Sequence, residues 1–287
     1  MNYTRRVKTF GFIDLNKPSG CSSAVFVAKI KRLTGQPCGH LGTLDPLASG
    51  VLPIGIGNAN RLFNYFLNKD KEYIARFKFG ETSDTLDSTG EVTKGGGVPS
   101  EAEIIAALPA FEGEIDQVPP KYSAKSVGGR RGYALARAGV EFDLPPKRVR
   151  VDGFELLGRG ESENEFSFKI RCGAGTYIRS LARDLAEALG TQGLMSALLR
   201  TKSGCFTIEN AVSPEELTEE NIENYIIPTE SVLDLPRLVV RESDRVFTGV
   251  KTRTAAEDGE YKLYRDETFY GLATVKNGAF ETVTKLC

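Results

Sequence analysis

The sequence GHLGTLDPLASGVLPIGIGNAN, residues 39–60, surrounds a single formal charge, Asp45, with glycine, proline and apolar residues. Its glycines permit backbone conformations and close approaches that side chains exclude, and Pro46 biases Asp45 toward an extended backbone. Because a buried, unpaired carboxylate is costly, we expect Asp45 to have a cationic partner or a chemical role. A glycine-rich Asp-Pro stretch is also a common turn, and these residues alone leave that alternative open.

The order of residues within this stretch is more specific than its composition. The segment GHLGTLDPLASGVLP resembles the G-H-x-G-x-L-D-P-x-A-x-G-x-L-P signature of the TruB family, the tRNA pseudouridine-55 synthases. The resemblance implies that Asp45 is the catalytic residue. It also implies that His40, the only histidine of the chain, enters the space left when the target base flips out of its stack.

Three further segments resemble motifs of the same family. The opening N-K-P-x-G run contains Lys17, the K-x-Y run ends at Tyr73, and GAGTYIRS contains Tyr177 and Arg179. The resemblance implies that Tyr73 packs against the target base and is a candidate base for proton removal, and that Leu198 lines the base pocket. It places Lys17 and Tyr177 among the substrate contacts. Without the resemblance, core packing is the usual role of such tyrosines and leucines.

Arg179 can also be argued from its position. It falls in the first turn of an expected helix at 177–189, where a cation is mildly unfavourable against the helix dipole. A nearby carboxylate would explain it, and Asp45 is our candidate; a solvated surface arginine is the alternative. In the family, this arginine pairs with the catalytic aspartate.

The pattern of apolar residues predicts an α+β fold with a mixed, largely antiparallel sheet, flanking helices and a small C-terminal β domain. We expect a catalytic domain at 1–235 and a PUA-like RNA-binding domain at 236–287. The following segments are expected to form helices or strands: strands 10–15, 73–79, 166–172, 237–240, 262–264, 268–275 and 279–284; helices 22–33, 61–67, 100–108, 133–138 and 177–189; an acidic helix-and-linker region 213–235.

Charge is segregated along the chain although the net charge is only −1. Residues 1–40 carry seven basic residues and one acid, and residues 121–150 carry eight basic residues and two acids, so each segment has a net charge of +6. We expect 121–150 to be a mobile insertion that faces RNA phosphates, with Arg130 and Arg131 among its contacts. Solvated charged faces are the alternative.

The remaining composition excludes several classes of protein. Five scattered cysteines and one histidine do not fit a zinc site, and the chemistry implied needs no cofactor or metal. We find neither an apolar run long enough for a membrane span nor a signal peptide, and expect a cytoplasmic monomer that acts on the T-arm of tRNA. The alternatives are a non-catalytic RNA-binding protein, a metal-dependent phosphotransferase and a guide-RNA-dependent synthase of the dyskerin type.

Overall fold

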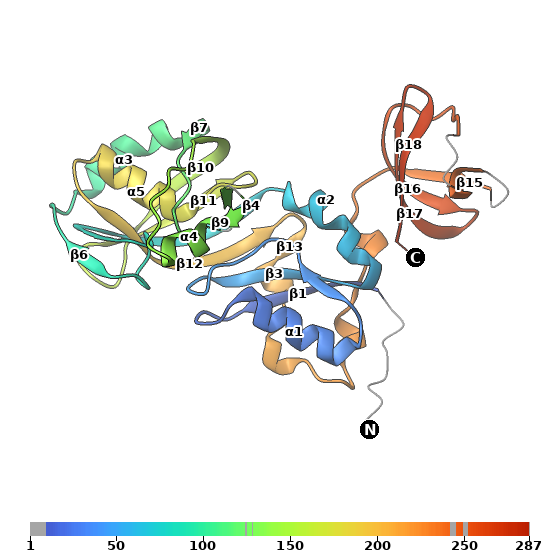
Figure 1. The fold of residues 1–287 in the computed structure, drawn as a ribbon, viewed down its shortest axis with the longest axis horizontal. Coiled ribbons are helices and arrows are strands. Elements are labelled where there is room, and N and C mark those ends of the chain that lie inside the picture. Colours follow the sequence, from blue (N-terminus) through green and yellow to red (C-terminus); the bar gives the residue numbers. More distant parts are fainter. Residues whose placement is uncertain (1–9, 124, 128, 242–244, 249–251, 287) are drawn as a thin grey trace.

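The computed structural model describes residues 10–123, 125–127, 129–241, 245–248 and 252–286. A sheet of ten strands runs through the larger part of the molecule (Figure 1). Its path is β14-β1-β3-β12-β4-β11-β10-β7, with β13 beside β12 and β2 beside β3. The strands of this sheet are β1 (Gly11–Lys17), β2 (Cys38–His40), β3 (Ser49–Ile56), β4 (Lys71–Phe79), β7 (Gly113–Gln117), β10 (Lys147–Arg159), β11 (Glu165–Cys172), β12 (Gly193–Ser203), β13 (Phe206–Thr207) and β14 (Ile227–Pro228).

The two halves of this sheet meet at a short seam between β3 and β12. These strands are parallel and pair only through Leu199 with Ser49 and Arg200 with Gly50, whereas the other described neighbours in the sheet are antiparallel. The loop that carries Asp45 runs directly into β3 at this seam. The sheet topology therefore brings the 39–60 stretch against β4 and β12, which are distant in sequence.

Helices cover the two halves separately. In Figure 1, α1 lies against the half with β2 and β3, and α5 lies against β12 and β4. The buried side of α5 includes Leu181, Ala182 and Leu185, the periodic positions expected from sequence. The helices are α1 (Ser23–Thr34), α2 (Phe63–Leu67), α3 (Glu101–Ala107), α4 (Gly132–Arg137) and α5 (Ile178–Ala188). The short 3₁₀ segments are η1 (Gly57–Leu62), η2 (Leu108–Phe111), η3 (Ile208–Asn210), η4 (Pro214–Glu216), η5 (Ile222–Tyr225), η6 (Thr229–Val232) and η7 (Arg245–Thr248).

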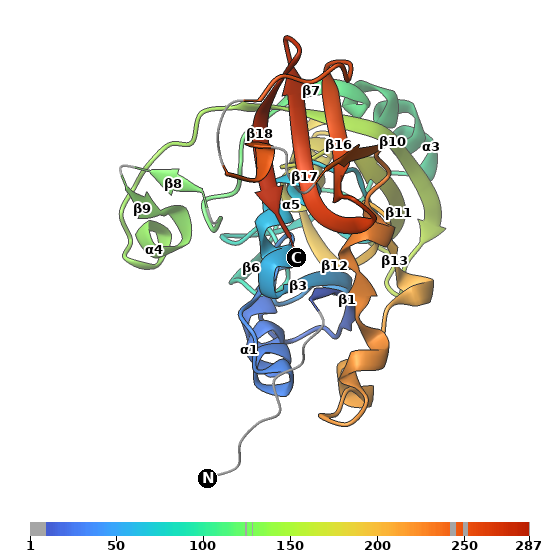
Figure 2. The same ribbon diagram turned by 90° about the vertical axis from the view of Figure 1, so that its right-hand side faces the viewer.

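A second sheet follows near the C-terminus, in the order β15-β16-β17-β18 (Figures 1 and 2). Its strands are β15 (Arg237–Val240), β16 (Gly259–Arg265), β17 (Thr268–Lys276) and β18 (Ala279–Lys285). It has its own apolar cluster around Leu263 and Val275, and Arg61 Nη1 ties it to η1 by donating to the Lys285 carbonyl over 2.8 Å. The predicted fold class, α+β with a largely antiparallel sheet and a C-terminal β domain, is confirmed; a domain boundary at residue 235 stays a prediction.

Some local predictions were wrong. The acidic stretch 213–235 contains 3₁₀ turns and β14 where a helix was expected. Two hairpins were not foreseen, one from β5 (Glu81–Ser83) and β6 (Val92–Lys94), the other from β8 (Ser126–Val127) and β9 (Arg130–Arg131). Short turns and hairpins of this kind depend on tertiary contacts more than on local pattern.

Candidate active site

Buried polar groups hold the loop that carries Asp45. The Ser23 hydroxyl, at the start of α1, donates to the Leu44 carbonyl (2.9 Å) and accepts from the Leu44 amide (3.0 Å). The Ala48 amide donates to the Asp45 carbonyl over 3.1 Å, which closes the Asp-Pro turn. The Asp45 backbone is therefore fixed on both sides of its side chain.

Lys17 also serves this loop. Its ammonium donates to the carbonyls of Ala48 (2.5 Å), Pro18 (2.9 Å) and Pro46 (3.3 Å), and the residue is 0% exposed. The donors of Lys17 are thus directed at backbone carbonyls and the residue is buried, and its contact with substrate stays a prediction. Lys17 holds the turn that follows Asp45.

Arg179 lies against the side chain of Asp45, as the sequence led us to expect. Its Nη2 is 2.9 Å from Asp45 Oδ2, and its Nη1 is 3.5 Å from Oδ2 of a second carboxylate, Asp87. Nη1 also donates to the Thr85 carbonyl (3.0 Å) and Nη2 to the Tyr122 carbonyl (3.1 Å). Because the guanidinium is buried and both of its Nη groups have partners, it can fix Asp45 in one orientation.

Asp87 was not singled out by sequence reasoning. It is 4% exposed, and its Oδ1 accepts from the Thr85 hydroxyl (2.8 Å), the Thr89 amide (3.0 Å) and the Thr89 hydroxyl (2.5 Å). Asp87 lies in the segment 80–92, to which no role was assigned from the sequence. The signal that could have found Asp87 was the match of this segment to the family's G-x-x-[ST]-D-T-x-D run.

Burial and two neighbouring charged groups have opposing effects on the pKa of Asp45. Burial raises the pKa of Asp45, the neighbouring Asp87 carboxylate raises it further, and Arg179 opposes both. The side chain keeps 36% of its surface exposed, whereas Arg179 keeps 7%. Arg179 thus only partly offsets burial and Asp87, and Asp45 takes up a proton at a higher pH than an isolated aspartate.

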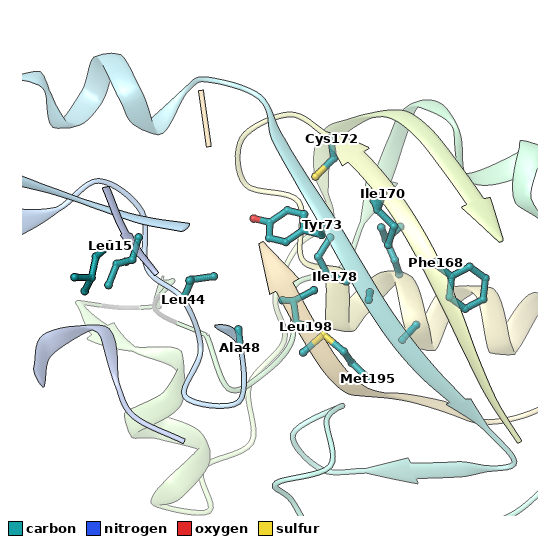
Figure 3. Packing of buried hydrophobic residues seen from close by; sticks show 14 of the residues in the cluster. Leu15, Leu44, Ala48, Tyr73, Phe168, Ile170, Cys172, Ile178, Met195 and Leu198 are labelled. Carbon is teal, nitrogen blue, oxygen red and sulfur yellow. The ribbon is translucent and has the colours of Figure 1, made fainter. Parts of the chain in front are cut away.

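Tyr73 and Leu198 form an apolar wall beside the loop. Figure 3 shows them projecting from neighbouring strands β4 and β12 toward Leu44 and Ala48, and all four belong to one buried cluster. Burial raises the pKa of Tyr73 to about 12, with Arg200 acting in the opposite direction. At neutral pH the phenol is therefore protonated, which weighs against the suggestion that Tyr73 accepts a proton.

Tyr177 and His40 lie at the margins of this region. The backbone of Tyr177 is held by Gln117, whose Oε1 accepts from the Tyr177 amide (2.8 Å) and whose Nε2 donates to its carbonyl (3.1 Å). His40 ends β2 and faces α1 residues such as Lys31; its buried Nδ1 has no partner among the described residues. Burial lowers the pKa of His40. Among the described residues, His40 forms no ion pair with Asp45.

The expected basic insertion is divided between two environments. Arg130 is exposed on β9, and Arg131 follows it on the same strand, with its side chain outside the described part. Arg148 and Arg150, expected to face RNA as well, lie on β10, where Arg148 pairs with Asp116 (3.1 Å) and Arg150 with Asp70 (2.5 Å). The neighbouring carboxylates of Arg148 and Arg150 make these two arginines weaker candidates for phosphate binding than the sequence indicated.

Two features are absent from the described ranges: a metal-binding group of side chains and a helix that could cross a membrane. Within them, no three or more His, Cys, Asp or Glu side chains gather as a metal-binding group. No helix in the part of the chain that the structure covers combines the length and apolarity needed to cross a membrane.

Comparisons with known proteins place this site in a family. Residues 31–178 match the TruB family pseudouridylate synthase N-terminal domain, and residues 179–234 match the tRNA pseudouridylate synthase B C-terminal domain. The "tRNA pseudouridine synthase B" of Clostridium tetani is 36% identical over 96% of this chain and 99% of its own length, and that of Synechocystis is 43% identical over 79% of each chain. Among solved structures, "Crystal Structure of a Cbf5-Nop10-Gar1 Complex" has a chain with a TM-score of 0.72 and 28% identity, covering 97% of this chain and 85% of that one. The chain therefore belongs to the TruB family of pseudouridylate synthases, which are RNA isomerases.

Proposed function

We propose that this chain converts the T-loop uridine of tRNA to pseudouridine, with Asp45 as its catalytic carboxylate. The observation that carries the assignment of Asp45 is its ion pair with buried Arg179, 2.9 Å long, at the centre of an otherwise uncharged loop. The tRNA substrate is supported by the curated relatives, which are named tRNA pseudouridine synthase B.

The reaction is an isomerisation in which no atom is gained or lost. The bond from the ribose C1′ to the base N1 breaks, the base turns, and C1′ bonds to C5; C5 loses a proton and N1 gains one. An ionised carboxylate near the sugar or base can act as nucleophile or proton acceptor. Asp45 fits either role, because Arg179 directs its carboxylate and the apolar neighbours Leu44 and Ala48 limit the access of water.

The other site residues take supporting roles. The target base must leave its stack, at a cost of a few kcal/mol, and Tyr73 with Leu198 offers an aromatic and aliphatic wall for it. His40, by family resemblance, fills the vacated place in the RNA. Arg179 and Asp87 fix the carboxylate. We assign Arg130 and Arg131 to phosphate binding.

The experiment compares three RNAs with the purified protein and no other macromolecule: a T-arm stem-loop, the same stem-loop with cytidine at the target position, and one with a scrambled loop. Pseudouridine is detected by reverse transcription after carbodiimide treatment. We expect modification of the first RNA only, and in the presence of EDTA as well. No modification of the T-arm RNA would refute the proposal, and modification that requires an added guide RNA would support the dyskerin-type alternative.

A further inference from the structure

Arg200, on β12, is a buried cation that forms no ion pair among the described residues, although its charge acts to lower the pKa of the buried Asp14 carboxyl. It is 2% exposed and is the largest of the fully buried side chains in the described part of the molecule. No described carboxylate forms an ion pair with it, in contrast to Arg179, which has two. Burying a cation is costly unless its donors are satisfied. The hydrogen-bond partners of Arg200 therefore indicate its role in the structure.

Those partners lie on both sides of Asp45. Arg200 Nε donates to the Val51 carbonyl over 2.7 Å, and Nη2 donates to the Gly42 carbonyl over 3.1 Å. Gly42 precedes Asp45 and Val51 follows it, so one guanidinium joins the two ends of the loop. Arg200 is also the register partner of Tyr73, the aromatic wall of the site, across β12 and β4, and its charge acts to lower the pKa of the Tyr73 phenol.

The seam of the sheet brings Arg200 to this position. Arg200 pairs with Gly50 across the parallel contact of β12 and β3, and a Cβ at Gly50 would lie 2.3 Å from the Arg200 carbonyl. Gly50 also has φ of +98°, which favours glycine. The loop can therefore approach β12 closely enough for one side chain to reach both of its ends.

We propose that Arg200 is a positioning residue for the reaction, which fixes the two ends of the Asp45 loop relative to each other and to strand β12. The inference rests on the proposed function of Asp45. A planar guanidinium presents separated donors in a rigid fork, whereas a lysine ammonium at this position concentrates its donors at one point and cannot span the Gly42 and Val51 carbonyls in the same way. A displacement of about 1 Å at a reacting group can reduce a rate ~10²-fold.

The test is Arg200→Lys, assayed on the T-arm stem-loop for kcat and KM separately. We expect kcat to fall ~10²-fold while KM stays within about threefold, because the loop is displaced and the RNA-binding surface is not. The matched control is Arg183→Lys on α5, where the guanidinium donates to the Val118 carbonyl (3.0 Å) and pairs with Asp184 (2.6 Å). That variant should keep kcat.

The outcomes separate this inference from the function it rests on. If the wild-type protein makes no pseudouridine, the proposed function fails. If the wild type is active and folded Arg200→Lys has an unchanged kcat, Arg200 is structural only and the inference is overturned. Should Arg200→Lys not fold, amide exchange in the wild type decides: the Leu44 and Ala48 amides must exchange as slowly as the core of β4, and rapid exchange there would show that the loop is not held.

Discussion

The loop at 41–48 and the basic insertion at 121–150 are the two regions most directly linked to function, and they differ in how the protein holds them. Buried side chains fix the loop at both ends and at Asp45: Lys17, Ser23, Arg179 and Arg200. In the insertion, Arg130 and Arg137 are exposed and form no ion pair with described residues. The difference indicates that the Asp45 carboxylate is held in place, and we propose that Arg130 and Arg137, unlike the paired Arg148 and Arg150, keep their charges available for RNA.

The largest effect is expected from Asp45→Asn, which keeps the shape of the side chain and removes its charge. We expect turnover to fall by ~10³-fold or more, because an amide is neither a nucleophile nor a proton acceptor here, while RNA affinity changes by less than a few fold. The control is Asp184→Asn on α5, another partly buried aspartate paired with an arginine, Arg183 at 2.6 Å. Near-wild-type turnover in Asp45→Asn would refute the catalytic assignment.

The second effect concerns Arg179→Gln. Arg179 opposes the rise in the pKa of Asp45 that burial and Asp87 cause, so its removal should raise that pKa further. Because the reaction needs the ionised carboxylate, activity is lost as pH falls through this pKa. The acid limb of kcat/KM should therefore move to higher pH in Arg179→Gln, with a larger loss of activity at pH 6 than at pH 8.5. Superimposable limbs would show that the pair does not control the charge of Asp45.

A third prediction extends the comparison to β1, which pairs with the strand that follows the loop. Asp14 is 3% exposed, Oδ1 has no partner among the described residues, and burial raises its pKa from 3.8 to about 7. Between these values the folded state holds a proton that the unfolded state has released, so stability falls as pH rises from about 4 to about 7.

Asp14→Asn removes this dependence. The free energy of unfolding of the wild type should fall as pH rises through this range, whereas that of Asp14→Asn should not. The difference between the two proteins should therefore change in favour of the variant by up to about 4 kcal/mol. Urea denaturation of both proteins at several pH values measures the difference. A difference that stays constant with pH would contradict the assignment.

The smallest effect on chemistry is expected in the insertion. Replacing Arg130 and Arg131 together with alanine should weaken binding of the T-arm stem-loop and flatten the dependence of affinity on salt, by roughly 0.7 in log–log slope for each lost single-strand contact. Arg148→Ala is the matched control, because Asp116 and Glu114 already neutralise that arginine. Equal slopes in the double variant and the wild type would show that Arg130 and Arg131 are merely solvated.

The sequence predicted the fold class and the pairing of Asp45 with Arg179, but it missed much of the support around them. Strand β3 was read as loop because Gly50, Pro53 and Gly55 are unfavourable within strands. The strand forms because β1 pairs with it from Gly50 to Ile56, while β12 and β2 pair with its two ends. A local pattern cannot show such a relation between distant strands.

The buried polar residues were the hardest to foresee for the same reason. Nothing in the run LLRTK distinguishes Arg200 from a solvated arginine, since its partners come from 42–51 and from Tyr73. Lys17 and Asp87 likewise take their roles from segments far away in sequence. Conversely, Arg148 and Arg150 looked like RNA contacts only because the carboxylates beside them, Asp116 and Asp70, come from other strands and loops.

The central claim is that a rigid loop performs the chemistry and a basic insertion binds the RNA. The most direct measurement is one single-turnover series on the T-arm stem-loop, with affinity and rate at saturation determined for Asp45→Asn and for the Arg130→Ala, Arg131→Ala double variant. We predict a crossed result: the first variant keeps its affinity and loses its rate, and the second loses affinity and keeps its rate. If both variants lose rate and affinity together, the two regions act as one unit, and the division of roles is contradicted.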